Sequence, residues 1–535
     1  MTKPKNLFIL FIFIVLLFGP AACSRQGGAD EFVVAIESYP GNLDPRYPND
    51  AYSSKIQQLI FNGLLKFDEQ LRLVPDLVDR YEYLSDTRMR FHLRPGVLFH
   101  DGRELSTQDV VYTFKSLMDP KQRSPLYETF QKVTELEAVD EATLEIELDE
   151  PFAPFLTALT AGIIPKGADE SSSLPFAQRP VGTGPFRFVA ARSDQWIRLA
   201  AFDRYFDKAP RLSTLLIRTI RDDTTRVLQL LNGQVDLVQN AVPLVMAQWL
   251  QERAKLEMES DTGINYAYLA FNLREPLLKN HKVREAIALA IDRDSLIHYR
   301  LKGFARPATG ILAPSNPYYE GEVATYAFNP ERAKALLDEA GWPDPDGAGP
   351  KPRFTLTLKT SNKRDRVAMA RAISGQLAQV GIELRVQPYE WGTFFRDIKT
   401  GNFQLYSSTW VGVTEPDIYY NTFDSGQTPP RGANRGYYSN PALDRLLEQG
   451  RKSTDFLVRK RIYSRVQKIL AEDLPYVSLW YEDNVAFLRP EVRGYALRPD
   501  SSLLGLARAW DETHAKDQTR SSSQNSSWSS PRSSN

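Results

Sequence analysis

The stretch FTLTLKTSNKRDRVAMARAISGQLAQVGIELRV, residues 354–386, constrains the fold more than any other part of the chain. Apolar residues alternate from Phe354 to Leu358, then recur every three or four residues up to Gly381, and alternate again from Ile382. A strand, a helix and a second strand in this order require parallel pairing and a right-handed crossover. The pattern therefore predicts an α/β fold.

Other segments are compatible with that fold. Residues 32–36 form an apolar run that ends at the turn Pro40-Gly41, and polar groups at such a strand end typically line clefts. Residues 53–67 are expected to be a helix. In TLEIEL (143–148) we expect a strand whose Glu145 and Glu147 face solvent. Three helix starts are predicted from their capping residues: Ser106 or Thr107, Asp222 with Asp223, and Asn329 followed by Pro330.

The length of 535 residues exceeds what one hydrophobic core supports, so two or more lobes are expected. The single cysteine excludes disulfides as a source of stability. Lysine plus arginine equals aspartate plus glutamate, and the net charge of zero argues against nucleic acid or an anionic membrane surface as partner. A small or weakly charged partner is expected.

The N-terminus has the layout of a secretory signal peptide. Lys3 and Lys5 precede an apolar run of about twelve residues, too short to span a bilayer, and Ala21-Ala22-Cys23 follow. We expect residues 1–22 to be cleaved, Cys23 to be lipidated and residues 23–30 to form a tether. The stretch resembles a lipobox, with Pro20 where a leucine is usual; plain secretion is the alternative. The Ser-rich tail, residues 513–535, is expected to be disordered.

Signatures of catalysis are missing from the sequence. VGTGPF (181–186) lacks the completion of a phosphate loop, and Asp344 and Asp346 lack the glutamate that a calcium loop needs. The five histidines show no paired spacing, and no G-x-S-x-G elbow occurs. We therefore expect no catalytic residue, no metal and no cofactor.

The ordered motifs of the chain resemble those of the extracytoplasmic solute-binding proteins of peptide-type ABC transporters. The likeness covers nearly all of residues 31–511 and rests on NLDP (42–45), IFNGLLKFD (60–68), FHLRPGVLFHDGRELSTQDVVYTF (91–114), PVGTGPFRF (180–188), NGQVDLV (232–238), LAFNLREPLLKNHKVREAIALAIDRDSLI (269–297), FNPERAKALLDEAGW (328–342) and YSNPALDRLL (438–447).

The resemblance implies a two-lobe type II periplasmic-binding-protein fold with an extra α+β subdomain, in which two crossing strands join the lobes and the lobes close on the ligand. On this basis lobe I comprises residues 31–52, 179–265 and 483–512, a satellite subdomain comprises 53–178, and lobe II comprises 266–482. Ligand binding then drives closure, because the ligand contacts both lobes only in the closed state.

The resemblance also indicates where the ligand binds, and here the sequence departs from the peptide-binding pattern. Those relatives carry an aspartate for the peptide amine four residues before a proline, but SSTWVGVTEPD (407–417) has Gly412 there. We propose Glu37 and Glu415 as substitutes, and the backbone of 410–412 as a partner for an extended peptide. Tyr39 and Trp410 are candidate walls, or else ordinary core aromatics. The candidate ligand-binding residues are Glu37, Tyr39, Trp410, Val411, Gly412, Val413, Thr414 and Glu415.

The function implied is that of a monomeric, lipid-anchored binding subunit outside the cytoplasm that delivers peptides or peptide-like solutes to an ABC permease. The missing aspartate favours one alternative, the same fold with another cargo such as a sugar, a metal chelate or an opine. A secreted enzyme or chaperone-like factor is the second alternative.

Overall fold

The computed structural model describes residues 31–513, except residues 49, 171, 172 and 348. The predicted signal peptide, Cys23 with its tether, and the tail beyond Thr513 lie outside the described residues. Among the described residues, no helix combines the length and the apolar character needed to cross a membrane.

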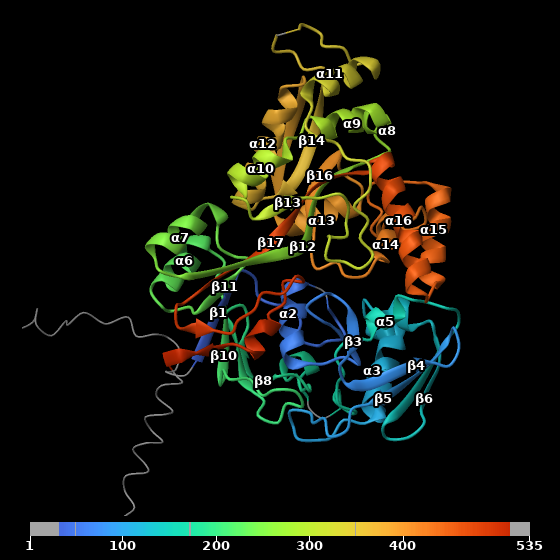
Figure 1. The fold of residues 1–535 in the computed structure, drawn as a ribbon, viewed down its shortest axis with the longest axis vertical. Coiled ribbons are helices and arrows are strands. Elements are labelled where there is room, and N and C mark those ends of the chain that lie inside the picture. Colours follow the sequence, from blue (N-terminus) through green and yellow to red (C-terminus); the bar gives the residue numbers. More distant parts are fainter. Residues whose placement is uncertain (1–30, 49, 171–172, 348, 514–535) are drawn as a thin grey trace, which may run out of the picture.

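A single sheet of eleven strands extends through both lobes (Figure 1). Its order is β15-β14-β16-β12-β17-β11-β1-β10-β9-β8, with β13 paired to β17. The long strands β12 (Glu257–Phe271) and β17 (Tyr476–Leu488) pair antiparallel and run from one lobe into the other. They match the two crossing strands that the resemblance implied. The predicted fold class is confirmed, while the exact boundaries of lobes and satellite stay a prediction.

Lobe I contains β1, β8, β9, β10 and β11 of the large sheet. Its elements are β1 (Glu31–Ile36), α2 (Ala51–Ile60), η2 (Phe176–Gln178), β8 (Phe186–Arg192), β9 (Trp196–Ala201), β10 (Thr214–Thr219), α6 (Asp223–Leu231), β11 (Leu237–Gln239), η3 (Leu244–Met246), α7 (Ala247–Arg253), β18 (Val492–Arg493), η4 (Leu504–Ala507) and β19 (Trp510–Asp511). The elements α2 and η2, which the predicted bounds place largely in the satellite, pack into the same apolar core as β1 and are described with it. Asp222 caps α6, because its side chain accepts from the backbone N–H of Thr225, as predicted.

The satellite has its own sheet and its own apolar core. The sheet order is β4-β5-β7-β6, and a separate hairpin joins β2 to β3. Its elements are β2 (Leu65–Phe67), β3 (Leu73–Pro75), β4 (Val78–Tyr83), β5 (Arg88–Leu93), α3 (Thr107–Met118), η1 (Pro120–Gln122), α4 (Tyr127–Phe130), β6 (Val133–Ala138), β7 (Thr143–Leu148) and α5 (Phe155–Ala158).

Two local expectations for this region are wrong. The helix predicted over 53–67 ends at Ile60, because Phe61 is extended and Gly63 lies so close to the backbone of Leu159 and Thr160 that a side chain would collide. Glu145 is buried rather than solvated: its carboxylate forms ion pairs with Arg88 (2.8 Å) and Arg90 (2.6 Å) across the sheet.

Lobe II contains the strand–helix–strand unit predicted from residues 354–386. β14 (Phe354–Ser361) and β15 (Ile382–Tyr389) pair in parallel from Phe354↔Ile382 onward, and α12 (Arg364–Ala378) connects them. The remaining elements are α8 (Pro276–Lys279), α9 (His281–Leu289), α10 (Arg293–Arg300), β13 (Ala305–Pro307), α11 (Pro330–Glu339), α13 (Trp391–Lys399), β16 (Leu405–Trp410), α14 (Ile418–Phe423), α15 (Pro441–Lys452) and α16 (Phe456–Asp473).

Candidate functional site

The registers of the large sheet place the carboxyl ends of its parallel strands at the junction of the two lobes. In lobe II, β16 runs antiparallel to β12 and ends with Trp410 opposite Tyr266, near the middle of β12. In lobe I, β11 and its parallel neighbour β1 run toward the middle of β17 from the opposite side. Open α/β sheets bind ligands beyond the carboxyl ends of their strands. The junction is therefore the candidate ligand site.

Contacts between the segments that follow these strands span the junction. The Nζ atom of Lys363, after β14, lies 2.9 Å from the Oε1 atom of Glu37, after β1. Arg366 of α12 pairs with Glu482 of β17 at 2.9 Å. About a third of the Arg366 side chain stays accessible.

Lys55 of α2 is a second cation at this junction. Burial lowers the pKa of its ammonium group to about 8, and the carboxylates of Asp500 and Glu37 oppose this shift only in part. Its Nζ atom lies 5.5 Å from the centre of the Tyr52 ring. A desolvated ammonium gains free energy when an anion reaches it. Lys55 is therefore a candidate contact for an anionic group, although Glu37 and Asp500 lie near it.

The satellite touches lobe II at a second place. Thr157 Oγ1 donates to Glu415 Oε2 (2.8 Å), and the backbone N–H of Ala153 donates to the carbonyl of Arg451 (2.8 Å). Lys452 and Glu150 form an ion pair at 2.7 Å. Together with the Glu37–Lys363 pair, these contacts join the two halves in the described structure.

Both acids that we predicted to bind a peptide amine are already paired. Glu37 holds Lys363, and Glu415 forms an ion pair with Arg459, whose side chain is only 5% exposed. A carboxylate with a cation of its own protein beside it gains less from a ligand ammonium than a free one does. The amine-binding role of Glu37 and Glu415 stays a prediction that these contacts weaken.

The remaining predicted residues divide between the junction and the lobe interiors. Val411 is about half exposed, and Gly412 adopts φ +65° with its N–H donating to Asn265 Oδ1 of β12 (3.1 Å). That N–H is thus occupied and unavailable for strand addition by a peptide. Val413 and Tyr39 pack against apolar cores of lobe II and lobe I, respectively. The carbonyl of Thr414 accepts from the Asn316 side chain.

Trp410 belongs to a ladder of aromatic rings and cations that the sequence did not indicate. Trp391, at the start of α13, is 55% exposed and stacks on Phe395, with ring centres 5.6 Å apart. The Arg435 guanidinium lies 5.3 Å from the Phe395 ring and 5.5 Å from the Trp410 ring. Trp410 in turn stacks on Tyr268 at 6.4 Å. The ladder leads from an exposed ring just after the carboxyl end of β15 into the interior of lobe II.

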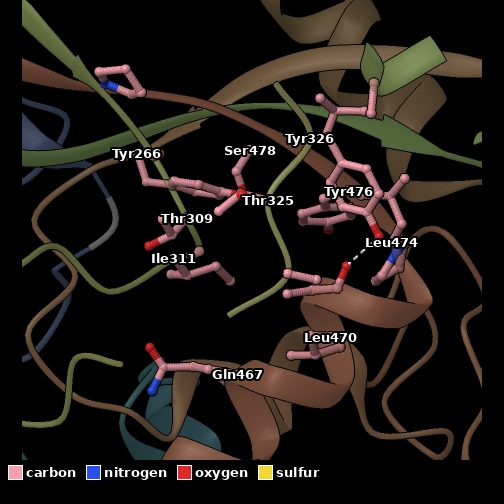
Figure 2. Close-up of a pocket in the computed structure, with 18 of the residues that line it drawn as sticks. Tyr266, Thr309, Ile311, Thr325, Tyr326, Gln467, Leu470, Leu474, Tyr476 and Ser478 are labelled. Carbon is pink, nitrogen blue, oxygen red and sulfur yellow. Dashed lines mark hydrogen bonds between the residues drawn. The ribbon is translucent and has the colours of Figure 1, made fainter. Parts of the chain in front are cut away.

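A separate cavity of about 130 Å³ lies inside lobe II, between β12, β17 and α16 (Figure 2). Tyr266, Thr309, Tyr326 and Tyr476 contribute to its walls. None of the predicted ligand-binding residues, Glu37, Tyr39 and 410–415, lines this cavity, so it is distinct from the predicted peptide site. Among the described residues, no group of three or more acidic, histidine or cysteine side chains is arranged to hold a metal.

Comparison with known proteins identifies the family. The sequence pattern of the bacterial extracellular solute-binding proteins, family 5, matches residues 72–430. The glutathione-binding protein GsiB of Pectobacterium atrosepticum is 29% identical over 486 residues, which cover 88% of this chain and 93% of the relative.

Solved structures agree with this assignment. The oligopeptide-binding protein AppA of Bacillus subtilis, solved with a nonapeptide, is 27% identical with a TM-score of 0.77 over 90% of this chain and 98% of AppA. The binding protein AgaA of A. tumefaciens R10, solved with agropinic acid, is 26% identical with a TM-score of 0.73 over 90% and 99% of the two chains. The chain belongs to the bacterial extracellular solute-binding proteins of family 5.

Proposed function

We propose that this protein is the binding subunit of an ABC importer, which captures peptides or peptide-like solutes between its lobes and delivers them to a membrane permease. One observation carries the proposal: the carboxyl ends of the parallel strands of both lobes meet at one junction, beside the two strands that join the lobes. A solute bound there contacts both lobes, so its binding energy favours closure. Relatives named for oligopeptide and glutathione binding support a peptide-like cargo.

The finer features of this role are proposals as well. We expect a monomer that is secreted and anchored by a lipid on Cys23, so that the folded body stays near the permease. We expect no catalysis, because family members bind solutes and the sequence lacks a catalytic signature.

A second candidate keeps the fold and changes the cargo to a solute that is not a peptide. The pairing of Glu37 with Lys363 and of Glu415 with Arg459 favours it, since neither acid is left free for a peptide amine. The agropinic acid in AgaA supports the same alternative. A secreted enzyme or chaperone-like factor has no such observation in its favour.

Thermal denaturation of the purified protein with solute panels tests the proposal. Peptides of two to nine residues are compared with sugars, metal chelates and opines, and a ligand that binds the folded state raises the melting temperature. We expect a shift of several degrees with at least one peptide. A clear shift with a non-peptide solute and none with any peptide would contradict the peptide cargo. Chemical conversion of a solute by the protein would support the alternative of a secreted enzyme.

A matched pair of tryptophan variants locates the site. Trp391 lies at the junction end of the ladder and is 55% exposed, whereas Trp249 lies on α7 of lobe I and is 49% exposed. Truncating an aromatic anchor in a binding site typically costs about 2 kcal/mol or more. Trp391→Ala should therefore weaken binding about tenfold or more in calorimetric titration, and Trp249→Ala should leave it unchanged. Equal effects of the two variants would place the site elsewhere.

A further inference from the structure

Among the described residues, five arginines are almost completely buried, and four of them have carboxylates or several backbone carbonyls as partners. The five are Arg46, Arg226, Arg284, Arg435 and Arg459. Arg46 holds two aspartates, and Arg459 holds Glu415. Arg284 donates to four backbone carbonyls, and Arg226 to carbonyls and to Asp223. A buried guanidinium without such partners loses the solvation that water gave it.

Arg435 is the exception among these five. Its side chain has aromatic neighbours: Phe395 and Trp410 on the ladder, and the tyrosines Tyr268, Tyr406 and Tyr476, which interact electrostatically with its charge. Among the described residues, no carboxylate lies within 4 Å of the Arg435 guanidinium, although this residue is 9% exposed. Cation–π contacts and a hydrogen bond with the Tyr406 hydroxyl compensate part of the lost hydration, but these partners are neutral, so the charge of Arg435 has no counter-ion beside it.

A buried donor without an acceptor lies beside it. The indole Nε1 of Trp410 is buried and has no hydrogen-bond acceptor in the described part of the chain. Buried indole N–H groups usually find a partner. A cation without a counter-charge and an unsatisfied indole N–H thus occur together at the carboxyl end of β16. That end of the strand faces the junction where the solute is proposed to bind.

We infer that Arg435 and Trp410 form a subsite for a carboxylate group of the bound solute. A carboxylate has four lone pairs and can accept both N–H groups of the guanidinium fork while also accepting the indole N–H. The inference rests on the proposed function and narrows its substrate class: the preferred cargo carries an anionic group, either a peptide's C-terminal carboxylate or an acidic side chain. Arg435 is thereby a specificity-determining residue.

Paired probes test this assignment. Each of a set of tripeptides is titrated in free-acid and C-amidated form, and with glutamate or glutamine at each position, into the wild type and into Arg435→Gln. We expect the wild type to bind at least one acid form about tenfold or more tightly than its neutral partner, and Arg435→Gln to remove that preference. Arg431→Gln is the control, because Arg431 is an exposed arginine four residues earlier in the same loop.

A second readout separates recognition from a structural role. If Arg435 serves to bind an anionic ligand, the melting temperature of Arg435→Met without ligand should equal or exceed that of the wild type, because the substitution removes a desolvated charge. A large fall in melting temperature together with equal weakening of acid and neutral peptides would mean that Arg435 only supports the fold, and would overturn the inference.

The outcomes also separate the inference from the proposed function. If peptides bind without any preference for the acid form, the proposed function is supported and the carboxylate subsite is contradicted. If no peptide binds but a non-peptide carboxylate such as an opine binds in a manner that depends on Arg435, the peptide cargo is contradicted and the subsite is supported. Trp410→Phe should lower the acid preference less than Arg435→Gln does, since it removes one neutral donor.

Discussion

Glu415 lies between two parts of the molecule and has a partner on each side. Arg459 of α16 forms an ion pair with it inside lobe II, and Thr157 of the satellite donates to it. Arg459 also donates to the carbonyl of Gly450 (3.0 Å). This network explains why an acid is needed at position 415 without any appeal to a ligand.

The variant Glu415→Gln tests this structural role. It leaves the Arg459 charge buried without a counter-charge, which should lower the free energy of unfolding by about 3 kcal/mol in urea denaturation. The double variant Glu415→Gln, Arg459→Met should lose less than the sum of the two single variants, because the charges are coupled. The control Glu448→Gln changes an exposed acid nearby and should stay within about 0.5 kcal/mol of the wild type. Unchanged stability with strongly weakened peptide binding would restore Glu415 as a ligand residue.

Residue types can be read from the sequence, but their partners cannot. Glu415 stands out beside Pro416, yet Arg459 lies 44 positions later on another helix. Arg435 gave no signal at all. Its importance depends on rings from β12, β16, β17 and α13 that surround it, and on the absence of a carboxylate there in the described structure. For this reason the sequence indicated Trp410 as a candidate but gave no ground for proposing Arg435, Phe395 or Trp391.

At the scale of elements, VGTGPF illustrates how a motif finds its explanation in packing. It was expected not to be a phosphate loop, and the structure supplies another reason for its glycines. A Cβ atom on Gly182 would lie 2.1 Å from the carbonyl oxygen of Ile60, and one on Gly184 would lie 2.5 Å from the Ile60 carbonyl carbon. The loop thus packs directly on the end of α2, which is possible only without side chains.

His100 of the satellite forms hydrogen bonds with the same loop, and its titration should make the free energy of unfolding depend on pH. Its Nδ1 accepts from the N–H of Gly182 (3.3 Å), and its Nε2 donates to the carbonyl of Gly184 (2.9 Å), an arrangement that requires the neutral ring. Burial lowers the pKa of His100 to about 4. The unfolded chain, with a histidine pKa near 6.5, therefore binds the proton first as pH falls.

The sign and size of this effect follow from proton linkage. Between about pH 6.5 and pH 4 the unfolded state holds more protons than the folded state, so stability falls with falling pH, by at most about 3 kcal/mol in all. His100→Gln keeps one donor and one acceptor but cannot titrate. Urea midpoints measured from pH 4 to pH 8 should fall less steeply for this variant than for the wild type. Parallel curves would show that His100 does not carry the pH dependence.

Elements with a strong local pattern were predicted well. The crossover unit β14–α12–β15 is confirmed, as are the caps at Asp222 and Asn329, because apolar period and capping chemistry act over a few residues. The helix expected over 53–67 was wrong in its second half. Its end depends on contacts of Gly63 with residues almost a hundred positions away, which no local pattern contains.

At the scale of the whole molecule, the order of strands in the large sheet could not be read from periodicity. β1 pairs with β10, from Glu31↔Thr214 onward, and β11 pairs with the far end of β17, Leu237↔Leu488. The family resemblance supplied this architecture, whereas alternation alone identified only strands. What the structure adds is the convergence of strand ends at the junction of the lobes.

Closure by rotation about β12 and β17 makes a prediction for distances across the junction. Cys23 is the only cysteine, so a Cys23→Ser background accepts two spin labels without interference. Labels at Val189 of β8 and Tyr299 of α10, exposed residues of lobe I and lobe II, report the separation of the lobes. Without solute we expect double electron–electron resonance to give a long or broad distribution of distances between the two labels. With a saturating concentration of a peptide that binds in the thermal screen, we expect this distribution to become shorter and narrower.

A label pair within one lobe distinguishes rotation from a general tightening of the fold. Tyr299 and Leu457 both belong to lobe II and are both about two-thirds exposed, so their separation should be the same with and without peptide. The Glu37–Lys363 and Glu150–Lys452 pairs are partly exposed and are worth at most about 1 kcal/mol each. We expect the solute to add to these contacts and to the hydrogen bonds of Thr157 and Ala153 in favouring closure. A distribution between Val189 and Tyr299 that is already short without peptide, and unchanged by it, would mean that the lobes stay closed without a solute and would end the proposed mechanism of capture.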